Sequence, residues 1–177
     1  LSPSRRLFLQ TGGALVVGFA LTPRGLLAQA AQPAKGKLPG SLGKAPYLDA
    51  WIAIGGDGAV TVFTGKAELG QGIKTALIQC AAEELDIDPQ TITIVAADTE
   101  RTANEGYTAG SHSMQDSGTA ILNAAAQVRA LLVELATTRL NVPADQLHAR
   151  SGAVLADDGR SVAYKDLVTG QELHRLA

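Results

Sequence analysis

Two short loops rich in glycine and hydroxyl residues carry the residue types best suited to binding chemistry. Residues 65–72 read GKAELGQG, and residues 106–113 read GYTAGSHS. In the first loop Gly70 and Gly72 allow backbone angles closed to other residues, and the amide of Gln71 between them offers donors and an acceptor without charge. In the second loop hydroxyls precede a helix, an arrangement that favours phosphate-like anions. We therefore predict one shared anionic ligand, with the Gln71 amide free to project toward it.

Other interpretations of these loops are weaker or excluded. An ordinary glycine turn with a solvated Gln71 is the alternative for the first loop. Neither loop is a Walker loop or a dinucleotide fingerprint, because the Gly-Lys-Ser/Thr and G-x-G-x-x-G patterns are missing. The single cysteine, Cys80, cannot form an internal disulfide, a thiolate zinc site or an iron–sulfur cluster. We predict no metal ligands in this chain.

The elements that must position the loops form an α+β pattern, with β-hairpins and short strands packed on two main helices. The expected elements are strands at 50–54 and 59–63 in a hairpin, an amphipathic helix at 72–86, a strand at 92–95, a helix ending near residue 140, and a second hairpin at 153–156 and 161–164. Between the third strand and the long helix lie about nineteen residues without periodicity, and loops of that length are usually functional. Ser117, inside the helix, should tolerate alanine.

Composition indicates a packed domain with a tail. The chain has 177 residues, of which 46% are hydrophobic and 18% charged, and this balance excludes disorder over the whole length. Residues 1–30 hold three of the 15 basic residues and no acidic residue, so the remainder is acidic. An acidic body with 4% aromatic residues is a poor nucleic-acid binder.

The N-terminal segment reads as an export signal. Arg5 and Arg6 precede Phe8, an uncharged stretch at 7–22 and the small-x-small triplet Ala-Gln-Ala at 28–30. We interpret residues 1–30 as a twin-arginine signal, which delivers folded cargo to the periplasm and suits a cofactor acquired in the cytoplasm. An uncleaved membrane anchor is the alternative. A linker at 31–46 and one domain at 47–177 complete the predicted organisation.

The two loops and their flanking segments resemble the molybdopterin-binding large subunit of the xanthine dehydrogenase family. The likeness lies in GKAELGQGIKTALIQCAAEELDI and, further on, GYTAGSHSMQDSGTA, and it extends over about residues 47–170. It is strongest to the exported, cytochrome-linked branch that includes isoquinoline oxidoreductase, nicotinate dehydrogenase and membrane aldehyde dehydrogenases. The resemblance implies that seven residues hold the pyranopterin and its phosphate, although His112 stands where the family varies. They are Gly70, Gln71, Gly72, Gly110, Ser111, His112 and Ser113.

The same resemblance implies the cofactor, the reaction and the partners. The cofactor would be a molybdenum pyranopterin in its cytosine dinucleotide form, acting on an aldehyde or an N-heteroaromatic substrate. Electrons would leave through a small [2Fe-2S] subunit and a c-type cytochrome carrying haem c, in a membrane-associated complex.

The resemblance covers only the N-terminal portion of such a subunit. The family's metal-covering loops and its C-terminal Gly-Glu base have no counterpart in the sequence, so we predict no catalytic residue here and assign neither Glu68 nor Glu105 that role. The remainder of the large subunit would supply them. A non-catalytic periplasmic cofactor-binding or assembly module is one alternative, and an unrelated exported phosphate-binding protein is another.

Overall fold

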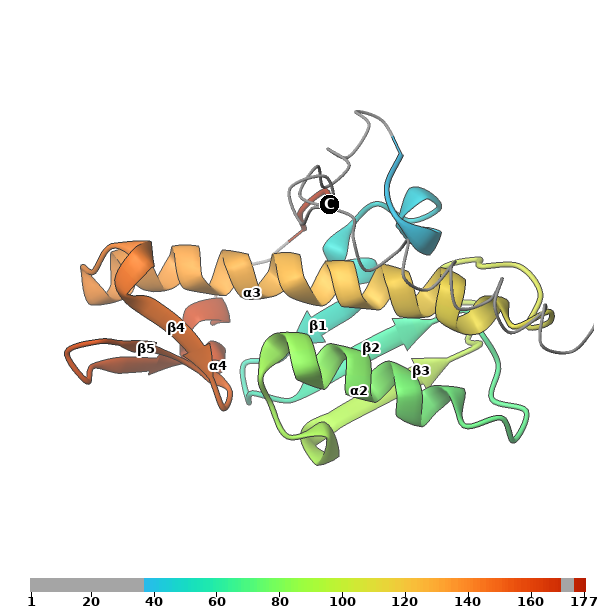
Figure 1. The fold of residues 1–177 in the computed structure, drawn as a ribbon, viewed down its shortest axis with the longest axis horizontal. Helices are drawn as coiled ribbons and strands as arrows, with labels where there is room; N and C mark the ends of the chain where they lie inside the picture. The colour runs from blue at the N-terminus through green and yellow to red at the C-terminus, as the bar shows by residue number, and fades with distance from the viewer. Residues whose placement is uncertain (1–36, 170–173) are drawn as a thin grey trace, which may run out of the picture. The chain divides into compact units, whose positions relative to one another are not determined.

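A computed structural model describes residues 37–169 and 174–177, and the predicted signal at 1–30 lies outside the described residues. The fold of residues 38–177 is α+β, as predicted (Figure 1). Its main elements, in order, are β1 (Ile52–Ile54), β2 (Val60–Thr64), α2 (Ile73–Leu85), β3 (Ile92–Ala96), a π-helical turn (Met114–Gly118), α3 (Thr119–Leu140), β4 (Leu147–Arg150), β5 (Ala153–Ala156), β6 (Ser161–Ala163) and α4 (Tyr164–Val168).

The first sheet has the order β1-β2-β3 and contains both kinds of strand pairing. β1 and β2 form the predicted antiparallel hairpin, with Ile52 opposite Val62. β3 then runs parallel to β2, and α2 makes the crossover between them. β2 alternates buried and half-buried residues, as expected for a strand rich in β-branched side chains with one face on the core.

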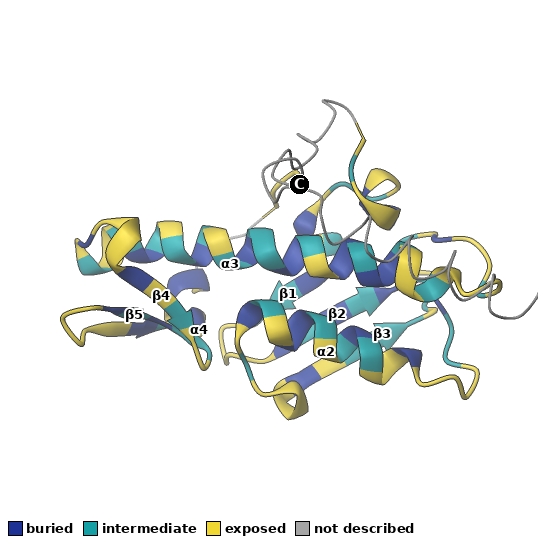
Figure 2. Ribbon diagram, viewed as in Figure 1, coloured by how far each residue is buried: buried dark blue, intermediate teal, exposed yellow. Residues whose placement is uncertain are grey.

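Helix α3 is the central core element. Its buried positions are mostly alanine, which lets α2 and the strands pack closely against it, as the dark face in Figure 2 shows. The helix ends at Leu140, and the next residue, Asn141, caps it in a left-handed conformation (φ 53°), two positions before Pro143. By length and composition alone the helical stretch Met114–Leu140 could cross a membrane, but the same apolar character follows from its packing in this core.

A second small sheet lies near the C-terminal end of α3, with the strand order β4-β5-β6. β5 and β6 form the predicted hairpin, whereas β4 (Leu147–Arg150) is an additional strand that the sequence pattern did not predict. The buried Tyr164 hydroxyl donates a hydrogen bond of 2.8 Å to the carbonyl of Leu85, at the end of α2. This bond connects α4, which follows β6 directly, to the end of α2.

The predicted boundary between linker and domain is wrong by several residues. Residues 38–46, expected to be linker, belong to the folded domain and contain a 3₁₀ turn, Gly40–Gly43. Leu42 in this turn is fully buried, and the backbone of Gly40 lies directly against the start of α3. A single leucine among glycines and prolines shows no periodicity, so local patterning contains no sign of this packing.

Candidate functional site

The two predicted loops meet because they leave the same edge of the first sheet. β2 ends at Thr64 and β3 ends at Ala96, and these residues are direct neighbours in the parallel register. Loops that follow the carboxyl ends of parallel strands share one edge, where ligands commonly bind in α/β sheets. The loop at 65–72 and the segment at 97–111 therefore come together, which agrees with the prediction of one shared ligand. The parallel pairing of the two strands was not predicted.

Glu68 organises the first loop. One of its carboxylate oxygens accepts hydrogen bonds from the N–H groups of Gly70 and Gly72, at 2.8 and 3.0 Å, and the other accepts from the N–H of Lys74 at 3.1 Å. These N–H groups, Lys74 first and then Gly72, hold the pKa of the Glu68 carboxyl below its ordinary value. The N-terminus of α2 is thus already matched with a carboxylate, which leaves an anionic ligand to the other loop.

The side chain of Gln71 is held by its own loop. Its amide nitrogen donates to the carbonyl of Ala67 at 2.8 Å, and its amide oxygen accepts from the N–H of Leu69. The expectation that this amide projects freely is therefore wrong. The physical reason is that the turn brings unpaired main-chain groups within reach of the amide, and pairing them is favourable.

The second loop enters its helix through two consecutive left-handed residues. Gly110 has φ 59° and Ser111 has φ 60°, and the helix begins at His112. A π-helical turn at Met114–Gly118 separates this start from α3. The N–H of His112 already donates to the carbonyl of Ala109 at 3.1 Å. The N–H groups that follow it lie at the positive end of the helix dipole, so this end of the loop can receive negative charge.

A pocket of about 460 Å³ lies between the two loops, which is within the usual range for small-molecule sites. Its lining residues are Leu69, Gln71, Gly72, Ile73, Ala76, Thr108, Ala109, Gly110, Ser111, Ser113 and Met114. Five of the seven predicted site residues are among them, and Gly70 and His112 lie in the same loops next to lining residues. The structure thus brings the two halves of the predicted site to one cavity.

The chemistry of this lining fits an anionic, partly flat ligand. None of the pocket-lining residues in the described part of the chain is charged, so no carboxylate there would repel a phosphate. Hydroxyls of Ser111 and Ser113 stand at the helix start, while Leu69, Ile73 and Met114 supply apolar surface for a ring system. The donor set therefore suits a pterin that carries a phosphate.

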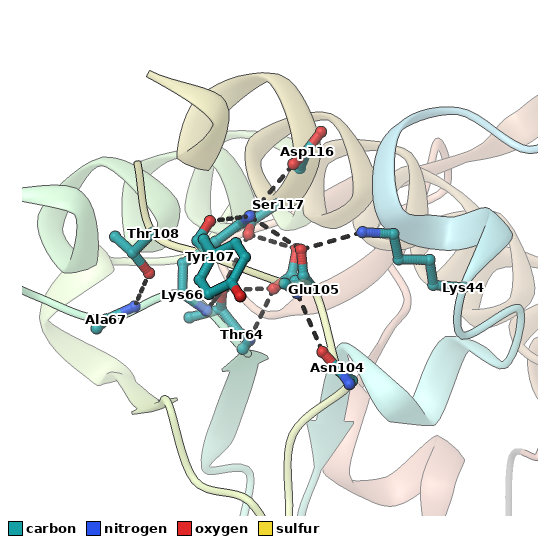
Figure 3. A network of polar contacts seen from close by, with 12 residues as sticks. Lys44, Thr64, Lys66, Ala67, Asn104, Glu105, Tyr107, Thr108, Asp116 and Ser117 are labelled. Atoms are coloured by element: carbon teal, nitrogen blue, oxygen red, sulfur yellow. Dashed lines mark hydrogen bonds and ion pairs between the residues drawn. The ribbon is translucent and has the colours of Figure 1, made fainter. Parts of the chain in front are cut away.

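Beneath the pocket, a buried polar network joins the two loops (Figure 3). Lys66 is 1% exposed and Glu105 is 2% exposed, and the buried Thr64 and Ser117 complete the cluster. The Glu105 carboxylate accepts from the hydroxyl of Ser117 at 2.6 Å, the hydroxyl of Thr64 at 2.8 Å and the N–H of Gly65 at 2.7 Å. These hydrogen bonds explain why a carboxylate can be buried here without a catalytic role.

Sequence reasoning missed this network, although one signal was available. Residues 60, 62 and 64 face the core in alternation, and Lys66 is the next residue in that series. Extending the strand's alternation by one step would have indicated a buried lysine that needs acceptors. The expectation that Ser117 tolerates alanine is also contradicted, because its side chain is fully buried and bonded to Glu105.

The described residues contain no cluster of side chains suited to hold a metal ion. Within 37–169 and 174–177, no three histidine, cysteine, aspartate or glutamate side chains gather closely enough to hold a metal ion. Cys80 is half-buried on α2, and burial raises the pKa of its thiol.

Fold and pocket together define a cofactor-binding domain in which two strand-end loops enclose an uncharged cavity. The family model for the molybdopterin cofactor-binding domain matches residues 17–175, and the chain belongs to this family. The resemblance to molybdopterin-binding subunits of the xanthine dehydrogenase family, stated from the sequence, is thereby confirmed.

Individual relatives agree with this assignment. The chain is 36% identical over 175 residues to a nicotinate dehydrogenase chain of Pseudomonas putida, covering 98% of this chain and 14% of that protein. It is 32% identical over 178 residues to the beta chain of isoquinoline 1-oxidoreductase of Brevundimonas diminuta, covering 96% of this chain and 22% of that protein. The chain therefore spans less than a quarter of the length of these relatives.

A solved structure shows the same fold. The fold superposes on the reconstituted CO dehydrogenase from Oligotropha carboxidovorans with a TM-score of 0.61 and 25% identity, over 70% of this chain and 16% of that one. The mixed arrangement of helices and small sheets is thus shared with a CO dehydrogenase chain several times longer.

Proposed function

We propose that this chain is the cofactor-binding part of a molybdenum hydroxylase and that the pocket between its two loops holds the pyranopterin. The observation that carries the proposal is the convergence of five predicted site residues on one cavity without charged lining residues. Family membership supports the identity of the ligand, and the geometry supports its place.

The residues of the two loops would divide the binding. Ser111, Ser113 and the helix N–H groups that follow His112 would hold the phosphate, because they offer neutral donors at the positive end of a helix. Gln71 would turn its amide from its own loop toward the pterin, since its exposed hydrogen bonds exchange at little cost. The cofactor, when bound, supplies the two-electron redox centre of the reaction.

The proposed reaction is oxidation of an N-heteroaromatic or aldehyde substrate with oxygen derived from water. The names of two relatives, nicotinate dehydrogenase and isoquinoline 1-oxidoreductase, support the heteroaromatic choice. This chain would bind and orient the cofactor, whereas the catalytic base would come from the remainder of the large subunit. Electrons would leave through a [2Fe-2S] subunit and a c-type cytochrome.

Exposed apolar side chains at the pocket support the proposal that another segment covers it. Two lining residues, Leu69 and Met114, are 71% and 45% exposed, and Tyr107, next to the lining residue Thr108, is 93% exposed. Apolar side chains gathered at the rim of a binding site are typical of a surface that another segment covers. We assign that role to the remainder of the large subunit, which is consistent with the small share of each relative that this chain spans.

We further propose that the protein is exported to the periplasm by the twin-arginine route and reaches the membrane through its partners. Arg5 and Arg6, with the uncharged stretch after them, support this proposal. Export of folded cargo allows the cofactor to be inserted before translocation.

The test is the molybdenum and pterin content of the assembled complex, purified from its own host. Gln71→Ala and Gly110→Val should each lower the content by about tenfold or more, because each disturbs one wall of the pocket. Gln79→Ala, at an exposed position of α2 away from the pocket, is the matched control and should retain full content. Release of a cytosine nucleotide on denaturation would identify the dinucleotide form.

Two outcomes of this test would redirect the proposal. Full cofactor content in Gln71→Ala and Gly110→Val would place the ligand against another surface. A loaded complex without turnover of any N-heterocycle or aldehyde would favour the non-catalytic assembly module.

A further inference from the structure

The ammonium group of Lys66 connects the two loops of the pocket from below. It belongs to the first loop, yet it donates to the main-chain carbonyls of Glu105 and Tyr107, each at 3.0 Å, and to the carboxylate of Asp116 at 3.2 Å (Figure 3). The two carbonyls lie in the segment at 97–111, and the carboxylate lies in the π-helical turn. One side chain therefore spans every segment that shapes the second wall of the pocket.

A second contact joins the same two loops beside the lysine. The N–H of Ala67 donates to the hydroxyl of Thr108 at 2.8 Å. Thr108 lines the pocket directly, whereas Lys66 does not. The position of Thr108 relative to Ala67 is thus set by a direct bond and by the lysine contact to the preceding residue.

The residue type fits the position closely. A lysine ammonium has three donors and no acceptor, and here it meets three acceptors within hydrogen-bond distance. Its negative partner, Asp116, keeps 31% of its side chain exposed, so the pair is only partly removed from water. A neutral side chain of the same length would leave two carbonyls and a carboxylate without this donor.

We propose that Lys66 is a positioning residue that fixes the separation of the two pocket loops before any ligand binds. The expected consequence, cofactor retention, rests on the proposed function. The contacts of Lys66 to Glu105, Tyr107 and Asp116, called here the Lys66 lock, lie within the chain itself. Its contact to Tyr107, together with the neighbouring bond from Ala67 to Thr108, holds residues 110–113 opposite Gln71 and Gly72.

The experiment compares Lys66→Met with Lys44→Met in the full chain and in the assembled complex. Lys44 donates to the same Glu105 carbonyl at 3.0 Å, but it comes from residues before β1 and does not join the loops. Amide hydrogen exchange reports local opening and needs no cofactor. In Lys66→Met, peptides covering 67–72 and 105–113 should exchange about tenfold faster, while peptides of β4 to β6 keep their native rates. Lys44→Met should leave both loops at native rates.

Cofactor content then connects the lock to binding. In the assembled complex, Lys66→Met should lower molybdenum and pterin content by about tenfold, and Asp116→Asn, which keeps an acceptor oxygen, should retain most of it. If Lys66→Met does not fold, Asp116→Ala replaces it and should speed exchange of 105–113 by about threefold, because it removes one of the three acceptors.

The outcomes separate this inference from the proposed function. Unchanged loop exchange in the folded Lys66→Met chain, or in Asp116→Ala as its replacement, would overturn the lock. An equal rise of exchange across all elements would also overturn it, because it would mean a general structural role. Faster loop exchange with no molybdenum even in the native complex would support the lock and refute the proposed ligand.

Discussion

Replacing Ser117 with alanine removes one hydroxyl from the centre of the buried network. That hydroxyl donates to one oxygen of the Glu105 carboxylate at 2.6 Å, and it lies 3.0 Å from the hydroxyl of Thr64. Both neighbours are buried, and water has no access to take the place of the lost donor. The Thr64 hydroxyl keeps its contact with the other carboxylate oxygen at 2.8 Å, so the damage falls on one oxygen of Glu105.

The expected loss of stability follows from that single unpaired oxygen. A hydrogen bond to a charged, buried acceptor contributes about 1.5–3 kcal/mol, and most of this is lost when the acceptor has no replacement donor. For a chain of this size each kcal/mol lowers the midpoint of thermal unfolding by about 2–4 °C. We therefore expect a midpoint roughly 3–12 °C below that of the native chain.

The assay is thermal unfolding followed by circular dichroism at neutral pH. Ser161→Ala is the matched control, because this serine lies exposed at the start of β6. It should shift the midpoint by less than about 2 °C, as expected for a surface substitution. If Ser117→Ala and Ser161→Ala unfold at the same temperature, the Glu105 network does not contribute the stability that its hydrogen bonds imply.

Three further predictions concern other parts of the chain. Gly40→Ala should lower the unfolding midpoint by several degrees more than Gly43→Ala. A Cβ at residue 40 would lie 2.5 Å from a main-chain oxygen of the π-helical turn, and its φ is +56°, whereas a Cβ at Gly43 has ordinary space. Equal midpoints would contradict the close packing at Gly40. Burial raises the pKa of Tyr164 to about 12, so the native chain should lose stability as the pH rises from 10 toward 12. In urea unfolding over this pH range, Tyr164→Phe should lose less stability than the native chain, and equal losses in the two chains would refute this. Replacement of Arg5 and Arg6 by lysine should leave the folded protein in the cytoplasm on cell fractionation, and normal periplasmic delivery would exclude the twin-arginine route.

Local sequence patterns were sufficient for most of the elements. The β-branched alternation at 60–64 and the apolar spacing of Ile73, Leu77 and Leu85 match β2 and α2 as the structure has them. The short strand β4 was not predicted, since four residues with a single buried leucine give too little periodicity. Whether β3 pairs parallel or antiparallel to β2 depends on contacts distant in sequence, which no local window contains.

The residues that line the pocket were predicted, but the polar contacts that hold the two loops in place were not. The glycines and hydroxyls of both loops were identified by residue type, and five of those residues meet in one pocket. Glu68, Lys66 and Glu105 act through partners that lie from two to 50 positions away in the chain. Because a charged residue in a loop is usually solvated, only the folded geometry distinguishes such a buried or capping group from a surface charge.

The π-helical turn at Met114–Gly118 has a consequence for how the pocket can change without disturbing the core. An α-helix places successive residues about 100° apart, so a turn that accommodates one extra residue rotates everything before it by roughly that angle relative to everything after it. Ser111 and Ser113 precede the turn, and the buried alanines of α3 follow it. Deleting one residue from the turn would leave the buried alanines of α3 packed in the core and would rotate the hydroxyls of Ser111 and Ser113 away from the cavity. The angular offset between ligand-facing and core-facing residues is thus encoded in the length of this one segment.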